Sequence, residues 1–314
     1  MLRSWAVQDS PPGAAVAALV ARGDVEVGWL DRAIYEERTV VALYNPRTAT
    51  AIVPADEVAA FGTAFLPDDD AGLKAIVDTA VPGRDEGFAE PVALAVDAIG
   101  DALDGVTLSR DDLHEALRER LPEELLPWCK GCESHHARRG LLVMAGLHGK
   151  LCIAGRAGRQ PAFARTDQLV GWEPPEDARA ELVKRYHRQY GASSAAHFAE
   201  WAGIGKAHAR AMWSESGDPG ERLDGLRVIA PGDPILLTRD REALIPDPAW
   251  RKQVWSSIPN TGVVLDDGEP VALWKARKQG KRLEVTLTGD DVPRDAFDRL
   301  AAHRGCTSVT LVSG

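Results

Sequence analysis

The sequence has no long hydrophobic run and very few cysteines. The apolar stretch AAVAALVA at residues 14–21 falls short of the roughly 18 residues that span a bilayer and lacks the cleavage context of a signal peptide. The four cysteines, Cys129, Cys132, Cys152 and Cys306, are too scattered in 314 residues to indicate a disulfide scaffold. These absences favour a cytoplasmic protein with free thiols. Hydrophobic residues make up 45% of the chain, which is enough for the core of a globular protein.

An excess of basic residues is also missing, since the net charge is −10. This charge argues at first against nucleic acid as a partner, because phosphates attract lysine and arginine. The charge is unevenly distributed, however: residues 1–127 carry 10 Lys and Arg against 24 Asp and Glu, a net of −14, whereas the remainder carries 27 against 23, a net of +4. Residues 129–165 contain seven basic residues and one acid, Glu133. A basic face on an acidic body is therefore expected.

Several common catalytic motifs are absent from the sequence. The chain has no glycine-rich phosphate loop, no Ser/His/Asp order of a hydrolase and no metalloprotease helix motif. We therefore expect no small-molecule cofactor.

Helical and strand-like segments alternate in an order that repeats along the chain. Apolar residues at helical spacing occur at 24–37, the strand-like TVVALY and TATAIVP flank an NPR turn, and PADEVAAF opens a further helix. A helix capped by Ser109, the helix HHARRGLLVMAGLHGK and the hairpin LCIAGRAGRQPAFAR repeat that order. We predict an α+β fold of tandem winged-helix units at 1–66, 71–172 and 176–231, followed by a small β-rich C-terminal region at 232–314.

The third unit has the clearest pattern. ELVKRYHRQYG predicts a helix that ends at Gly191, Ser193 or Ser194 can cap a second helix, and KAHARAMW follows the GIG turn as a third helix. This order is typical of a helix-turn-helix, in which the last helix enters the major groove of DNA with Lys206, His208 and Arg210 on its polar side. Short helices around a glycine turn also occur in bundles that bind no DNA, so both interpretations stay open.

Strand-like segments dominate the C-terminal region. TGVVLDDGEPVALWKARKQGKRLEVTL predicts a β-meander with turns at DDG and KQG. The second turn gathers Lys275, Arg277, Lys278, Lys281 and Arg282, which suits the tracking of phosphates or simply keeps a hairpin tip soluble. Our candidate phosphate contacts in the whole chain are Arg138, Arg139, Lys206, Arg210, Lys275, Arg277 and Arg282.

Taken in order, five stretches resemble the AlkZ-like DNA glycosylase family. They are QDSPPGAAVAALVAR, LDRAIYEERTVVALYNPRTATAIVPADEV, RYHRQYGASSAAHFAEWAGIGKAHARAMW, DPILLTRDREALIPD and TGVVLDDGEPVALWK. The resemblance implies tandem winged helices around a concave surface that binds double-stranded DNA, including alkylated DNA, and an N-glycosylase activity on bulky alkylated purines. A non-catalytic winged-helix protein, either a lesion shield or a transcriptional regulator, is the alternative. A protein-interaction role without DNA is a third, suggested by the acidic N-terminal part.

The resemblance also implies a water-binding motif near the N-terminus, formed by a Gln, an apolar residue and then Gln or Asp. Counting back from Arg22 without a gap places Gln8 at the first position and Ser10 at the last, with Asp9 where the apolar residue stands. A frame shifted by two places Ala6 first and Gln8 last. Family members have a helix before this motif, whereas seven residues precede Gln8 here, so we expect an N-terminally incomplete first unit or a late start.

The chemistry of base excision explains why such residues matter. Cleavage of an N-glycosidic bond passes through an oxocarbenium-like sugar and needs a water aimed at the anomeric carbon. A purine alkylated on a ring nitrogen is already cationic, so positioning of the water is sufficient without protonation of the leaving group. Gln8 can orient that water, with Ser10 assisting and Asp9 as a stronger base. In the competing interpretation QDSPP only begins a helix, with Asp9 or Ser10 as its cap.

Two further groups of residues are candidates for other roles. WCKGCESHH holds Cys129, Cys132, His135 and His136, and a CxxC beside histidine suggests zinc. Four ligands in so short a span cannot easily surround one ion, and although Cys152 could join them, we expect a packed turn and no metal. Six tryptophans, Trp172, Trp201, Trp213, Trp250, Trp255 and Trp274, could stack on a flipped base. Trp201, Trp213 and Trp274 lie on apolar stripes and are expected in the core.

Overall fold

The computed structural model describes residues 7–158, 160–220, 223–257 and 260–314. One sheet of six strands has the order β1-β3-β2-β7-β8-β4. Its members are β1 (Val7–Gln8), β2 (Val40–Tyr44), β3 (Thr50–Pro54), β4 (Leu108–Ser109), β7 (Cys152–Ala157) and β8 (Gln160–Ala164). The pairing of Ala42 with Ile153 joins the β2–β3 hairpin to β7, so the hairpins of the first two predicted units share one sheet.

Helices between residues 14 and 170 pack on this sheet or on one another. They are α1 (Ala14–Arg22), α2 (Trp29–Tyr35), η2 (Ala55–Glu57), α3 (Val58–Ala64), α4 (Asp70–Val77), α5 (Ala89–Ala102), α6 (Arg110–Arg118), η3 (Glu123–Leu125), α7 (Arg139–Leu147) and α8 (Thr166–Val170). The predicted cap of α6 is confirmed, since Ser109 accepts a hydrogen bond from the amide of Asp112. The prediction of a helix from His135 was wrong, because His135 pairs with Trp128 in a two-stranded hairpin and α7 begins only at Arg139.

The three helices predicted for the third unit are present as α9 (Ala178–Tyr190), α10 (Ala195–Ala202) and α11 (Lys206–Met212). Ser194 caps α10 by accepting a hydrogen bond from the amide of His197. The α10–α11 turn needs glycine at 203, where φ is +71° and an added Cβ would lie 2.3 Å from Cγ of Arg47. Fully buried Phe198 and nearly buried Tyr186 pack with Trp213 between the helices.

The C-terminal region forms a second sheet in the order β13-β12-β11-β10-β9. Its strands are β9 (Arg227–Ile229), β10 (Gly262–Asp266), β11 (Glu269–Gln279), β12 (Arg282–Gly289) and β13 (Ser308–Ser313), and the accompanying helices are η4 (Pro234–Leu237), α12 (Arg241–Leu244), α13 (Pro248–Val254), η5 (Arg294–Phe297) and α14 (Asp298–His303). The predicted meander is confirmed by the antiparallel pairing of β10, β11 and β12. Strand β9 lies within the third predicted unit but pairs with β10.

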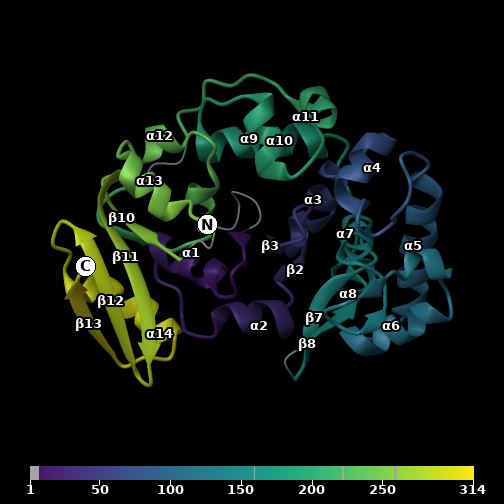
Figure 1. The fold of residues 1–314 in the computed structure, drawn as a ribbon, viewed down its shortest axis with the longest axis horizontal. Coiled ribbons are helices and arrows are strands. Elements are labelled where there is room, and N and C mark those ends of the chain that lie inside the picture. The colour runs from purple at the N-terminus through teal and green to yellow at the C-terminus, as the bar shows by residue number, and fades with distance from the viewer. Residues whose placement is uncertain (1–6, 159, 221–222, 258–259) are drawn as a thin grey trace.

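The N-terminal helix α1 packs against β9 and α14 of the C-terminal region. An ion pair fixes this contact, since Arg22 donates two hydrogen bonds to Asp233, of 2.8 and 3.0 Å. Figure 1 shows the resulting arc, with β10–β13 at one end, α9–α11 in the middle and α4–α8 at the other end. The stretch AAVAALVA forms most of α1, and no helix in the described ranges is long and apolar enough to cross a membrane.

Candidate active site and DNA-binding surface

Gln8 lies at the edge of the six-stranded sheet and faces a small cavity. Strand β1 pairs with β3 through Val7↔Ile52 and Gln8↔Ala51, and because side chains alternate along a strand, Val7 is buried in the core while Gln8 points the other way. The cavity is lined by Gln8, Asn45, Arg47, Phe61, Phe65, Gln189, Tyr190, Trp201, Ala202, Pro234 and Leu237. Elements far apart in the sequence therefore meet around one amide.

Arg47 holds the Gln8 side chain from the NPR turn between β2 and β3. The turn is closed by Asn45, whose carbonyl accepts from the Thr48 amide at 2.8 Å and whose side chain accepts from the Ala49 amide at 3.1 Å. This places Arg47 so that its Nη2 donates to Oε1 of Gln8. Burial is the main cause that lowers the pKa of Arg47, yet guanidinium stays charged at neutral pH. The hydrogen bond is thus charge-assisted and fixes the orientation of the amide.

The opposite wall of the cavity comes from α9 and α10. Tyr190 donates to the carbonyl of Pro234 at 2.6 Å and accepts from Nε1 of Trp201 at 2.9 Å. Burial raises the pKa of Tyr190, so its hydroxyl is neutral and serves to connect α9 with the 231–234 segment. Gln189, which is 6% exposed, adds a second amide to the wall. Trp201 lines the cavity, whereas Trp274 lies in the core of the C-terminal sheet as expected.

The size of the cavity decides what it can hold. Its volume is about 30 Å³. A cavity needs roughly 10–15 Å³ on this measure to hold a water molecule and at least two polar partners to fix it. The amides of Gln8 and Gln189 are such partners. The cavity can therefore hold an ordered water, and a purine has to remain outside it.

The two residues that follow Gln8, Asp9 and Ser10, have different surroundings. Asp9 accepts hydrogen bonds from the amides of Gly13 at 2.8 Å and Ala15 at 3.1 Å, so its carboxylate caps the first turn of α1. Ser10 is exposed, and its carbonyl accepts from Nε2 of Gln8 at 3.2 Å. Neither residue lines the cavity. In the second alignment frame the first position, Ala6, lies outside the described residues.

Two of the candidate phosphate contacts lie at the N-terminus of α7. Arg139 is exposed, donates to the carbonyl of Thr48 at 3.3 Å and stacks over Tyr44, with 5.2 Å from Cζ to the ring centroid. It is therefore next to the NPR turn that carries Arg47. Arg138 is half-buried and donates to the carbonyl of Trp128 at 2.6 Å. Arg138 is thus partly committed to the protein, while Arg139 lies on the surface beside the cavity.

The helix α11 presents two exposed cations, Lys206 and Arg210. His208, expected on the same polar side, is 5% exposed, and burial lowers its pKa. The expectation for His208 was wrong because position 208 packs inward against α9, while positions 206 and 210, four residues apart, lie together on the outer side. Lys206 and Arg210 are exposed on the outer side of α11, so both stay candidate phosphate contacts.

The cationic hairpin of β11 and β12 is exposed at Lys275, Arg277 and Arg282. Arg277 pairs with Glu284 at 3.3 Å, and Arg282 donates to Gln279 at 2.7 Å. Figure 1 places this sheet at the end of the arc opposite α5 and α6. A DNA contact there would therefore require an extended footprint.

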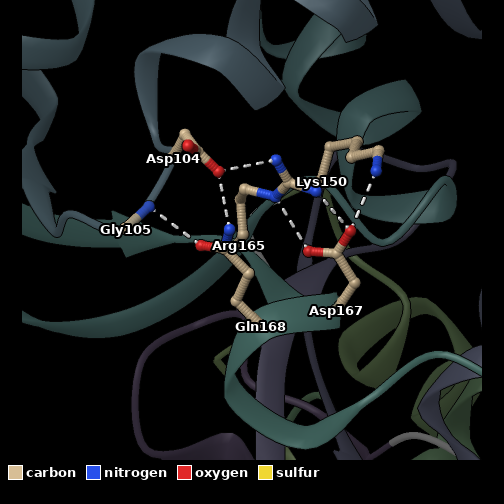
Figure 2. A network of polar contacts seen from close by, with 6 residues as sticks. All are labelled: Asp104, Gly105, Lys150, Arg165, Asp167 and Gln168. Atoms are coloured by element: carbon tan, nitrogen blue, oxygen red, sulfur yellow. Dashed lines mark hydrogen bonds and ion pairs between the residues drawn. The ribbon is translucent and has the colours of Figure 1, made fainter.

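Part of the basic stretch at 129–165 is not available to a ligand. Lys150 donates to Asp167 at 2.8 Å, and Arg165 pairs with both Asp167 and Asp104, as Figure 2 shows. Burial alone would raise the pKa of Asp167, but the hydrogen bonds from Arg165 and Lys150 lower it to about 2. These cations stabilise the second predicted unit, so the expected basic face is smaller than the sequence indicates.

The sequence patterns did not predict Arg47, Gln189 or Tyr190 as site residues. Arg47 had a usable signal, since a cation at the tip of a tight turn between two strands is held in a defined position. Gln189 and Tyr190 stand in RYHRQYG, where helical spacing was assigned to packing alone. Nothing in that spacing shows which end of the helix faces Gln8.

A cavity with two amides, a fixed guanidinium and exposed cations nearby suits a protein that acts on DNA through a positioned water. Comparison with known proteins agrees: the model of the family described as DNA glycosylase AlkZ-like matches residues 2–305, and the chain belongs to this family of DNA repair glycosylases. The predicted family resemblance is thereby confirmed.

The fold is similar to that of a solved structure, Streptomyces sahachiroi DNA glycosylase AlkZ. The TM-score is 0.72 at 16% sequence identity, and the match covers 99% of this chain and 92% of that chain. The prediction of a mixed helix and sheet fold is confirmed. A comparison with curated protein sequences found no match.

Proposed function

We propose that the protein hydrolyses the N-glycosidic bond of bulky alkylated purines in double-stranded DNA, with Gln8 positioning the attacking water. The observation that carries this proposal is the orientation of the Gln8 amide into a cavity of about 30 Å³, fixed there by Arg47. An amide carbonyl has two lone pairs. One accepts from Arg47, and the other is free to accept from a water.

The reaction requires little more than a well-placed water. A ring-alkylated purine leaves as a neutral base, so no acid has to protonate it, and alignment of the water supplies the main catalytic gain. Gln189 gives the water a second polar partner from α9. Because the cavity cannot hold a purine, the base stays in the open surface outside, which suits bulky lesions.

Cations around the cavity provide the binding energy for DNA in this proposal. Arg139 beside the NPR turn and Lys206 and Arg210 on α11 contact phosphates. Arg138, Lys275, Arg277 and Arg282 extend the footprint along the arc. The three predicted winged-helix units would then form one duplex-binding surface.

One observation favours a non-catalytic alternative, in which the protein shields lesions or regulates transcription. Asp9, the strongest base of the N-terminal motif, caps α1, and no carboxylate lines the cavity within the described residues. Binding of alkylated duplex without release of base would support this alternative.

Counting abasic sites separates the two functions. Duplex DNA alkylated at guanine is incubated with wild type, Gln8→Ala and the control Gln168→Ala, whose side chain binds Asp104 away from the cavity. We expect abasic sites from wild type and the control, and far fewer from Gln8→Ala. If all three proteins produce no more abasic sites than DNA incubated without protein, the glycosylase proposal is wrong. An affinity for DNA that does not change with ionic strength would in addition favour a protein-interaction role.

A further inference from the structure

A hairpin outside the cavity brings two thiols and an imidazole together. Strands β5 (Trp128–Cys129) and β6 (Ser134–His135) pair through Trp128↔His135 and Cys129↔Ser134. The sulfur atoms of Cys129 and Cys132 and a ring nitrogen of His136 all lie within 4.8 Å of one another. We propose that these three residues bind a zinc ion.

The protonation of His136 leaves one nitrogen available for a metal. Its ring is 9% exposed, and Nδ1 lies 2.8 Å from the carbonyl oxygen of Ala137. A carbonyl oxygen only accepts hydrogen bonds, so Nδ1 carries the proton and Nε2 carries a lone pair. Among the residues that the structure describes, this buried Nε2 has no hydrogen-bond partner other than the neighbouring thiol of Cys129. Metal-binding histidines have this arrangement, with the second nitrogen bound to a carbonyl.

The distances fit a tetrahedral ion after a small adjustment. Zinc bonds of about 2.3 Å to sulfur and 2.0–2.1 Å to nitrogen require donor atoms roughly 3.5–3.8 Å apart. The separations here are at most 4.8 Å, so each pair would close by at most about 1.3 Å. Gly131 lies in the turn between the two cysteines, and an added Cβ there would meet nothing within 4 Å, so the turn has room to move.

The neighbouring candidates do not complete the site. His135 is not part of the cluster, because its ring packs edge-on against Trp128, with 5.2 Å between the ring centroids. Cys152 lies in the main core on β7 and is not part of the cluster. The cluster offers three ligands, so a water would take the fourth position. Two thiolates select a soft cation such as Zn²⁺ over Mg²⁺ or Ca²⁺.

The site would fix a surface element near the proposed DNA contacts. Arg138, the residue before α7, donates to the carbonyl of Trp128 in the same hairpin. A bound ion would link Cys129 on β5 and Cys132 in the turn to His136, two residues before Arg138. It would thereby fix the start of α7.

Metal content of the full-length chain tests the proposal. Fully reduced protein is incubated with Co²⁺ or Zn²⁺ and freed of excess metal; wild type, Cys132→Ser and the control His135→Gln are compared. We expect one ion per chain in wild type and control, the visible absorption bands of tetrahedral cobalt with thiolate ligands, and at least 10-fold weaker binding by Cys132→Ser. Cys132 is exposed, so its replacement by serine leaves the fold intact.

Three results would overturn the proposal. The first is reduced wild-type protein that retains no metal, which would assign the pair of cysteines to free thiols or to a disulfide. The second is equal binding by wild type and Cys132→Ser. The third is loss of binding by His135→Gln with retention by His136→Gln. None of these measurements uses DNA, so the outcome is independent of the glycosylase proposal.

Discussion

The ion pair between Arg22 and Asp233 joins α1 to the segment before Pro234, which lines the cavity at Gln8. Its side chains are 10% and 0% exposed, and the two hydrogen bonds are parallel and short. Replacement of Arg22 by methionine leaves the Asp233 carboxylate buried without its cation. Removal of one partner of a buried pair typically costs about 3–5 kcal/mol. We expect Arg22→Met to lose that much of the free energy of unfolding.

A second ion pair between the same parts of the chain provides the control. Arg299 pairs with Asp24, but these side chains are 52% and 94% exposed. Exposed pairs contribute about 0–1 kcal/mol, so Arg299→Met should be close to wild type. The double variant Arg22→Met with Asp233→Asn removes both charges and should recover part of the loss. Urea unfolding measures all four proteins, and equal losses for Arg22→Met and Arg299→Met would refute the reasoning.

Three further predictions follow from individual contacts. Gly203→Ala places a Cβ 2.3 Å from Cγ of Arg47 at a φ of +71°, so we expect the free energy of unfolding to fall by about 1–3 kcal/mol and base release to be slower. Gly217→Ala, which has open space around the added Cβ, should change neither quantity. The pKa of Asp167 is about 2 in the folded state against about 3.9 in the unfolded state, so its ion pairs add to the free energy of unfolding fully above pH ~4 and lose this effect as the pH falls towards ~2. The contribution is at most about 2 kcal/mol, because a fifth of the side chain is exposed. The free energy of unfolding of Asp167→Asn should lose this pH dependence between pH ~4 and ~2, and an unchanged pH dependence would count against the ion-pair network. Lys206→Ala and Arg210→Ala should each reduce the slope of log DNA affinity against log salt concentration by the amount of about one phosphate contact, while Lys184→Ala should not. If this slope is unaltered in both variants, α11 is not part of the DNA interface.

Local patterns in the sequence predicted the elements whose signals are local. The helices α9–α11 could be read from apolar spacing, the glycines at 191 and 203 and the cap at Ser194, since each signal acts within one turn of helix. The meander of β10–β12 was likewise marked by its two turns. These elements form the frame on which the site is built.

The site itself depends on pairings over long distances in the chain. Arg47 meets Gln8 across 39 positions, and β2 meets β7 through Ala42 and Ile153. Such contacts follow from sheet order, which apolar spacing does not encode. Local sequence also left the role of Asp9 open, since it could act as a base or as a helix cap. In the structure its carboxylate caps α1.

The rate of base release by Gln8→Ala tests the central claim most directly. Single-turnover reactions on alkylated duplex DNA, with the DNA affinity measured alongside, separate chemistry from binding. We predict a rate at least about 100-fold below wild type with unchanged affinity, because the water loses its positioning amide. Equal rates for the two proteins, or a loss of affinity that explains the whole decrease, would contradict it.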